Sequence, residues 1–119
     1  MPNPKKQSEE LAIVTSAYDI ALELTRRVRK FPRDLRFVLG DRILNTAYDL
    51  LDVLLEAKYT QDKAGLLSRA NGLLDRLRYQ MRLCVDEKLI SLRQYEYLAV
   101  KFDETGRMAG GWKRSRKEP

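Results

Sequence analysis

The sequence predicts an all-α protein, an antiparallel up-and-down four-helix bundle. Apolar side chains recur at spacings of three and four along four segments, and no stretch alternates with the period of a strand. Short breaks rich in Pro, Gly and polar residues separate these segments, which favours antiparallel neighbours. With 119 residues and a hydrophobic content of 44%, the chain is expected to bury one core in one domain.

The first segment is expected to begin at Ser8, a favourable N-cap followed by Glu9 and Glu10 in the first turn. Residues 1–7 hold two prolines and two lysines and are expected to form a mobile arm before a bundle of residues 8–111. This helix should end near Lys30. Its predicted core face consists of Leu11, Val14, Ala17, Tyr18, Ala21, Leu24 and Val28.

The second helix is predicted from Arg33 to Tyr59, after a Phe31–Pro32 step. A residue before proline disfavours helical angles, whereas proline suits the start of a helix, and Phe31 should pack over that start. The apolar side chains divide into two adjoining sets that are together wider than the stripe of about 100° that a small bundle requires. The set assigned to the core is Leu35, Leu39, Ile43, Leu50, Val53 and Leu54.

The second set is predicted to meet another subunit. Its members are Phe37, Leu44, Tyr48, Leu51 and Leu55. The alternative is a central helix buried on several sides within one chain.

A break at YTQDKAG, residues 59–65, precedes the third helix, which is predicted to run to about Lys88. It places nine side chains on one core face: Leu66, Leu67, Ala70, Leu73, Leu74, Leu77, Met81, Cys84 and Val85.

Ser91 stands three residues before Gln94, the spacing of a capping box, and is predicted to start the fourth helix. The predicted core face is Tyr95, Leu98, Ala99, Phe102, Gly106 and Ala109. Tyr97, Val100 and Met108 point elsewhere and give a second indication of an oligomer contact. Gly110 and Gly111 are expected to end the helix, Trp112 to close the end of the core or an interface, and residues 112–119 to form a basic tail.

Basic residues number 23 against 17 acidic ones, with a pI near 9.6, so the protein should attract polyanions. Three clusters carry the excess: Arg26, Arg27, Arg29, Lys30, Arg33 and Arg36; Arg69, Arg76, Arg78 and Arg82; and Arg107, Lys113, Arg114, Arg116 and Lys117. Of the third cluster, Lys113, Arg114 and Arg116 are the predicted binding residues. Guanidinium groups bind two phosphate oxygens at once, which predicts non-specific, salt-sensitive binding of RNA or DNA. For any single arginine the alternative is a long side chain that lies over the rim of the core. Base-specific recognition is not indicated, because the aromatic residues lie mostly on apolar faces.

The composition argues against catalysis. The chain has no histidine, the commonest general base and zinc ligand, so neither an enzyme nor a metal site, a cofactor or a small-molecule substrate is expected. The single cysteine, Cys84, cannot form an internal disulfide, which indicates a reducing cytoplasm. No apolar run approaches the roughly 18 residues of a membrane span, and no signal peptide is expected.

Four sequence motifs occur in an order that resembles the accessory variability determinant (Avd) proteins of diversity-generating retroelements: KFPRDLRFVLGDRI, LLDVLLEAKY, RANGLLDRLRYQMRLC, and SLRQYEYL with GRMAGGWK. The likeness covers about Leu11 to Lys113. It implies a homopentameric barrel that binds a reverse transcriptase and its template RNA during mutagenic retrohoming and catalyses nothing. It also implies a cytoplasmic protein encoded by a bacterium, an archaeon or a phage.

The same four-helix architecture is shared by the intervening-sequence proteins encoded within some ribosomal RNA genes. A protein of that type would be a basic oligomeric scaffold for RNA or for an acidic protein partner. The Phe-Pro, Leu-Gly-Asp-Arg and Gly-Gly-Trp-Lys elements of this chain look closer to Avd.

Overall fold

A computed structural model describes the backbone of residues 4–115 and the side chains of residues 10–113. Within this range every regular element is a helix and there is no strand, as predicted. The elements are α1 (Pro4–Val28), α2 (Arg33–Leu35), the π-helical segment η1 (Arg36–Gly40), α3 (Asp41–Lys58), α4 (Ala64–Asp86) and α5 (Leu92–Ser115). Because α2, η1 and α3 follow one another without a break, the described residues form four rods.

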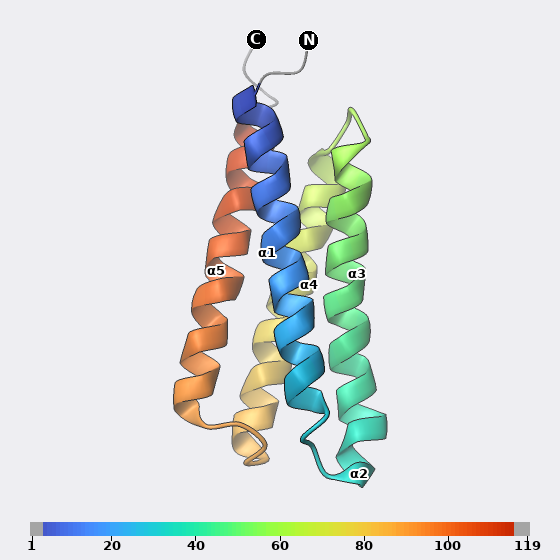
Figure 1. The fold of residues 1–119 in the computed structure, drawn as a ribbon, viewed down its shortest axis with the longest axis vertical. Coiled ribbons are helices and arrows are strands. Elements are labelled where there is room, and N and C mark those ends of the chain that lie inside the picture. The colour runs from blue at the N-terminus through green and yellow to red at the C-terminus, as the bar shows by residue number, and fades with distance from the viewer. Residues whose placement is uncertain (1–3, 116–119) are drawn as a thin grey trace.

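The rods pack as a four-helix bundle. Both α1 and α4 pack against α3 and α5, so α1 and α4 occupy diagonal corners. The connections from α1 to α2 and from α4 to α5 lie at one end, which we call the turn end (Figure 1). The connection from α3 to α4 lies at the opposite end together with the start of α1 and the end of α5, and we call this the termini end. The predicted antiparallel up-and-down arrangement is therefore confirmed.

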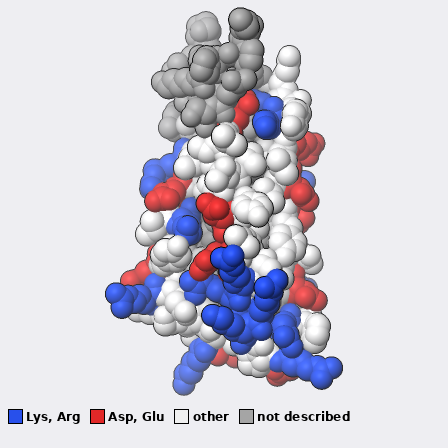
Figure 2. All heavy atoms as spheres, in the orientation of Figure 1, with Lys and Arg blue, Asp and Glu red and all other residues white. Residues whose placement is uncertain are grey.

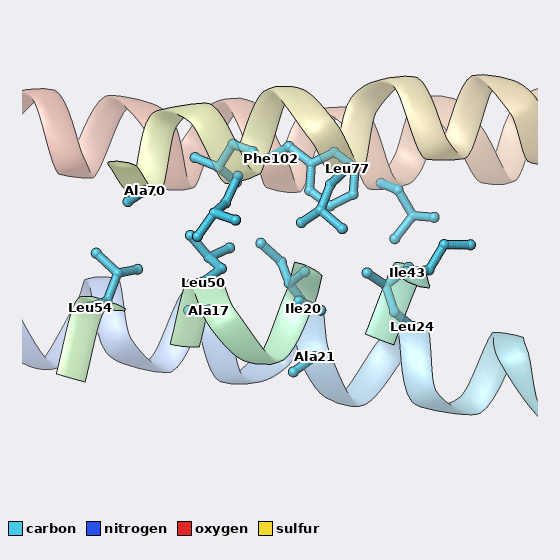
Figure 3. Close-up of a cluster of buried hydrophobic side chains, with 14 of the residues drawn as sticks. Ala17, Ile20, Ala21, Leu24, Ile43, Leu50, Leu54, Ala70, Leu77 and Phe102 are labelled. Atoms are coloured by element: carbon cyan, nitrogen blue, oxygen red, sulfur yellow. The ribbon is translucent and has the colours of Figure 1, made fainter. Parts of the chain in front are cut away.

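Side chains from all four rods meet in one core. Figure 3 shows Ile20 of α1, Leu50 of α3, and Leu77 and Phe102 of α4 and α5 directed toward one another. All of these are inaccessible to solvent. The alanines Ala17 and Ala47 lie among them and allow the backbones of α1 and α3 to approach closely.

The core face predicted for the first helix is partly wrong. Leu11 is 62% exposed and Tyr18 is 55% exposed, whereas Ile13 and Ile20 are buried. The apolar residues of this segment fit two overlapping stripes with the same period, and periodicity alone does not choose between them. The packed bundle selects the stripe that contains the two isoleucines.

Two helix ends also differ from expectation. The first helix begins at Pro4, so Ser8 lies inside it and is not the N-cap. The last helix continues through Gly110 and Gly111 to Ser115. Glycine costs about 1 kcal/mol in a helix interior, but burial of Ala109 and Trp112 on either side of the pair outweighs this cost.

Lys63 joins three elements at the termini end. Its ammonium group donates hydrogen bonds to the carbonyl oxygens of Ala57 and, at 2.6 Å, of Thr60, where α3 ends. It also lies 4.9 Å from the centroid of the Trp112 ring. A cation here satisfies carbonyl groups that the helix leaves open. Trp112 is only 2% exposed, so it closes the end of the core, the first of the two places that the sequence allowed for it.

The predicted capping box starts α5. The backbone N–H of Ser91 donates to Oε1 of Gln94 at 2.8 Å, and the N–H of Gln94 donates to Oγ of Ser91 at 3.1 Å. Both donors would otherwise be open at the start of a helix. The adjoining turn uses Lys88 in the left-handed conformation, with φ of 61°.

The π-helical segment was not predicted. The sequence suggested an unbroken α-helix from Arg33, whereas Arg36–Gly40 is π-helical, a form whose backbone hydrogen bonds span five residues instead of four. This segment brings the backbone of Gly40 against the end of α1. A Cβ atom on Gly40 would lie 2.7 Å from Cγ1 of Val28, so only glycine fits without a shift of α1.

Substitution of Gly40 by Ala is therefore expected to destabilise the protein by about 1–3 kcal/mol, the usual cost of overpacking a filled site. Chemical denaturation of the variant and the parent protein measures this difference. In a Val28→Ala background the same substitution should cost clearly less, because the opposing methyl group is gone. An equal cost in both backgrounds would show that the contact with Val28 is not the cause.

Candidate nucleic-acid interface

The strongest concentration of positive charge surrounds the turn between α1 and α2. We call this the turn cluster; its members are Arg26, Arg27, Arg29, Lys30, Arg33 and Arg36. The last turn of α1 supplies Arg26 and Arg27, and the turn that follows it supplies Arg29 and Lys30. Pro32, with φ of −53° and ψ of 148°, redirects the chain so that α2 and η1 supply the other two. Phe31 is buried beneath this turn, as predicted. Figure 2 shows Lys and Arg atoms gathered at the turn end of the face that α1 occupies in Figure 1.

Most of the turn cluster is free to bind an anion. Arg26, Arg29, Lys30 and Arg33 are exposed, and none has a carboxylate partner among the residues that the structure describes. Arg27 differs, because it pairs with Glu23 at 2.7 Å on the same helix and its side chain is largely covered. Four unpaired cations close together create a positive potential that attracts a multivalent anion.

Arg36 forms a distinct part of the turn cluster. Its Nε atom is covered and has no hydrogen-bond partner in the described part of the chain. Its guanidinium carbon lies 5.5 Å from the centroid of the Phe37 ring, a cation–π arrangement. Arg36 is thus positioned by its stem and by an aromatic ring, and not by a carboxylate.

The arginines of α4 do not form one surface. Arg76 lies with Arg42 and Gln80 in the groove between α3 and α4, whereas Arg82 lies with Tyr95 in the groove between α4 and α5. Arg78 donates to Asp75 at 2.6 Å and to Asp103 of α5 at 2.9 Å. Two carboxylates offset its charge, so Arg78 joins two helices and is a poor candidate for phosphate binding. Arg69 is exposed.

The third predicted cluster lies at the termini end. Nζ of Lys113 donates to Oγ of Ser68 at 3.0 Å, which links α5 to α4. The side chain of Arg114 and the whole of Arg116 fall outside the described residues. The structure therefore separates the turn cluster from this one by the length of the bundle and does not bring the three clusters together.

The apolar set that was predicted to meet another subunit divides in two. Leu44 and Leu51 are half-buried and pack against the core of the same chain, as the alternative interpretation held. Phe37, Tyr48 and Leu55 are exposed, and so are Tyr97, Val100 and Met108 of α5. Exposed apolar side chains on α3 and α5 thus remain candidates for association.

Two exposed apolar residues of α1 extend these surfaces and were missed in the sequence. Leu11 lies with Lys101 and Met108 in the groove between α1 and α5. Tyr18 is also exposed on α1. Elsewhere on α1, a hydrogen bond of 2.9 Å between Thr25 Oγ1 and Tyr48 Oη links this helix to α3. Figure 2 shows that uncharged surface continues above the turn cluster on this face. Because both residues were assigned to the core face, no exposed apolar surface was predicted on α1.

The described residues also bear on thiol chemistry, metal binding and membrane insertion. Cys84 is fully buried, and burial raises the pKa of its thiol to about 11, so the reactive thiolate is scarce at neutral pH. Across the described residues no group of three or more His, Cys, Asp or Glu side chains is arranged to hold a metal ion. No helix of the described range has both the length and the apolar content to span a membrane.

Comparison with known proteins identifies a family. A family model described as bAvd-like matches residues 11–116, which include the turn cluster, most of α1 and all of the other three rods. No curated protein and no solved structure matches the chain.

Proposed function

Because the chain belongs to the bAvd-like family, we propose that it is a non-catalytic accessory subunit of a diversity-generating retroelement. In this role it binds the reverse transcriptase together with template RNA and cDNA during mutagenic retrohoming, in the cytoplasm of its host. The observation that carries the proposal is the turn cluster, where four cations lie exposed without carboxylate partners in the described structure.

The chemistry of the turn cluster suits a phosphate backbone. Arg26, Arg29 and Arg33 each present a planar guanidinium that can donate two hydrogen bonds to one phosphate. Such contacts release counterions and carry no sequence information, so binding should depend strongly on salt and weakly on sequence. This is the behaviour required of a subunit that must follow different template sequences.

Association of several copies would strengthen the effect. We infer a homo-oligomer, a pentamer if the chain follows the Avd pattern, in which exposed apolar residues of α3 and α5 meet between neighbours. Tyr48, Leu55, Tyr97 and Val100 support this arrangement, because large apolar side chains at exposed positions are typical of protein interfaces. Each additional copy repeats the turn cluster and raises the local positive potential.

Titration of single-stranded RNA with the purified protein at several salt concentrations tests the proposal. Four phosphate contacts on a single strand give a slope of about −3 in a plot of log affinity against log salt. A rise from about 50 to about 200 mM salt should therefore weaken binding by roughly 50-fold. The second arm of the test is co-purification of the protein with the reverse transcriptase that is encoded beside it.

The two arms separate the candidate functions. Salt-dependent RNA binding together with co-purification supports the Avd role. RNA binding without any affinity for the polymerase would favour the scaffold role of an intervening-sequence protein. Absence of both at low salt contradicts the proposal.

A further inference from the structure

The π-helical segment holds an exposed aromatic ring beside the turn cluster, and this pairing suggests what form of nucleic acid the site takes. Phe37 is 61% exposed and the following Val38 is 67% exposed. We propose that Phe37 is a stacking platform for an unpaired base, so that the turn cluster takes single-stranded nucleic acid in preference to a duplex. The inference rests on the proposed function, because it concerns the same site.

The position of Phe37 is held from two sides. The stem of Arg36 is covered, and its guanidinium group lies 5.5 Å from the centroid of the ring. One turn further along, Gly40 is fixed against Val28 at the end of α1. An apolar ring that is held in place and still exposes most of its surface to water offers area that a planar base can cover.

The surrounding charge selects the kind of occupant. Arg33 precedes Phe37 by four residues along the same rod, the spacing at which side chains share a face. Arg33 and the neighbouring Arg29 and Lys30 are exposed and lack carboxylate partners in the described structure. An apolar protein segment would gain nothing from these cations, whereas a nucleic-acid strand contacts them with its phosphates and the ring with a base.

The ring distinguishes a single strand from a duplex. Bases in a duplex are stacked on one another inside the helix, so a surface phenylalanine gains no base contact there. In an unpaired strand each base has a free face, and stacking on an aromatic side chain is insensitive to base identity. The turn cluster alone would bind both forms through their phosphates, so the preference should depend on Phe37.

The chain offers a matched control at its other end. Tyr59 is 81% exposed, and Lys58 lies 5.5 Å from the centroid of its ring, so it too is an exposed aromatic residue with a cation above it. It follows α3 at the termini end, far from the turn cluster. An effect common to all exposed aromatic residues would be seen equally at Tyr59.

The experiment compares Phe37→Ala with Tyr59→Ala in binding to a single-stranded RNA, a single-stranded DNA of the same sequence, and the corresponding duplex. Loss of one stacked base typically weakens binding about tenfold, so Phe37→Ala should bind either single strand about tenfold more weakly. Its affinity for the duplex should stay within about twofold of the parent protein, since phosphate contacts are untouched. Tyr59→Ala should bind all three ligands as the parent protein does.

A second variant gives a direct signal. Phe37→Trp keeps a stacking surface and should retain single-strand affinity, and stacking of a base should quench its fluorescence. The native Trp112 is buried at the termini end and provides a constant background. Quenching by the duplex equal to that by the single strand would overturn the inference.

Two further outcomes would also overturn it. One is an unchanged affinity of Phe37→Ala for single strands, with the parent protein still binding them. The other is a fall in the mass of the assembly for Phe37→Ala, because Phe37 would then belong to a contact between copies, as the sequence first suggested. Failure of the parent protein to bind any nucleic acid is a different result, which counts against the nucleic-acid binding that the proposed function includes.

Discussion

Simultaneous replacement of Arg26, Arg29 and Arg33 by Gln is expected to weaken binding of single-stranded RNA at least about tenfold at moderate salt. Three phosphate contacts are lost, so the slope of log affinity against log salt should become shallower by about 2. The net charge falls only from +6 to +3, and the protein stays basic. The altered side chains are exposed and pair with no described carboxylate, so the thermal midpoint should hardly change.

A variant of equal charge provides the control. Replacement of Arg69, Arg76 and Arg82 by Gln removes the same three charges from α4, where Arg76 and Arg82 lie in different grooves. The logarithm of its affinity for RNA should fall by less than half as much as in the variant of the turn cluster. Equal losses in the two variants would mean that net charge alone controls binding, and the turn cluster would no longer be the interface.

The second large effect concerns association. Glutamate in place of Leu55 of α3, or of Val100 of α5, is expected to reduce the assembly to species approaching the 13.9 kDa monomer. Each residue is exposed in the single chain, so the core is not disturbed, but a contact between copies would have to bury an unpaired charge. Sedimentation at micromolar concentration measures the change in mass.

Leu83→Glu is the matched control for this prediction. Leu83 is an exposed leucine of α4 that belongs to neither candidate set. Its substitution should leave the mass unchanged. An assembly that survives Leu55→Glu and Val100→Glu but dissociates in Leu83→Glu would place the contact on α4.

Two structural features that depend on residues close together in the sequence were predicted correctly. The capping box at Ser91 and Gln94 and the turn at Phe31–Pro32 each depend on residues a few positions apart, and the structure contains both. The core face of α4 was also predicted closely, because most of its apolar residues form a single stripe. Here periodicity leaves no second choice.

Features that depend on contacts between elements were missed. The π-helical segment ends where Gly40 lies against Val28 of another helix. Trp112 is buried in the core with Lys63, far along the chain, against its ring, and Arg78 pairs with Asp103 on the neighbouring helix. The exposure of Leu11 and Tyr18 follows from which of two equivalent stripes the bundle accepts. None of these contacts can be recognised from the spacing of residues along the sequence.

The proposed function depends on association of copies of this chain through exposed apolar residues of α3 and α5, which repeats the turn cluster in the assembly. Sedimentation of the unmodified protein at micromolar concentration tests this association most directly. The expected result is one species several times heavier than the 13.9 kDa chain. A lone chain at that concentration would contradict the account.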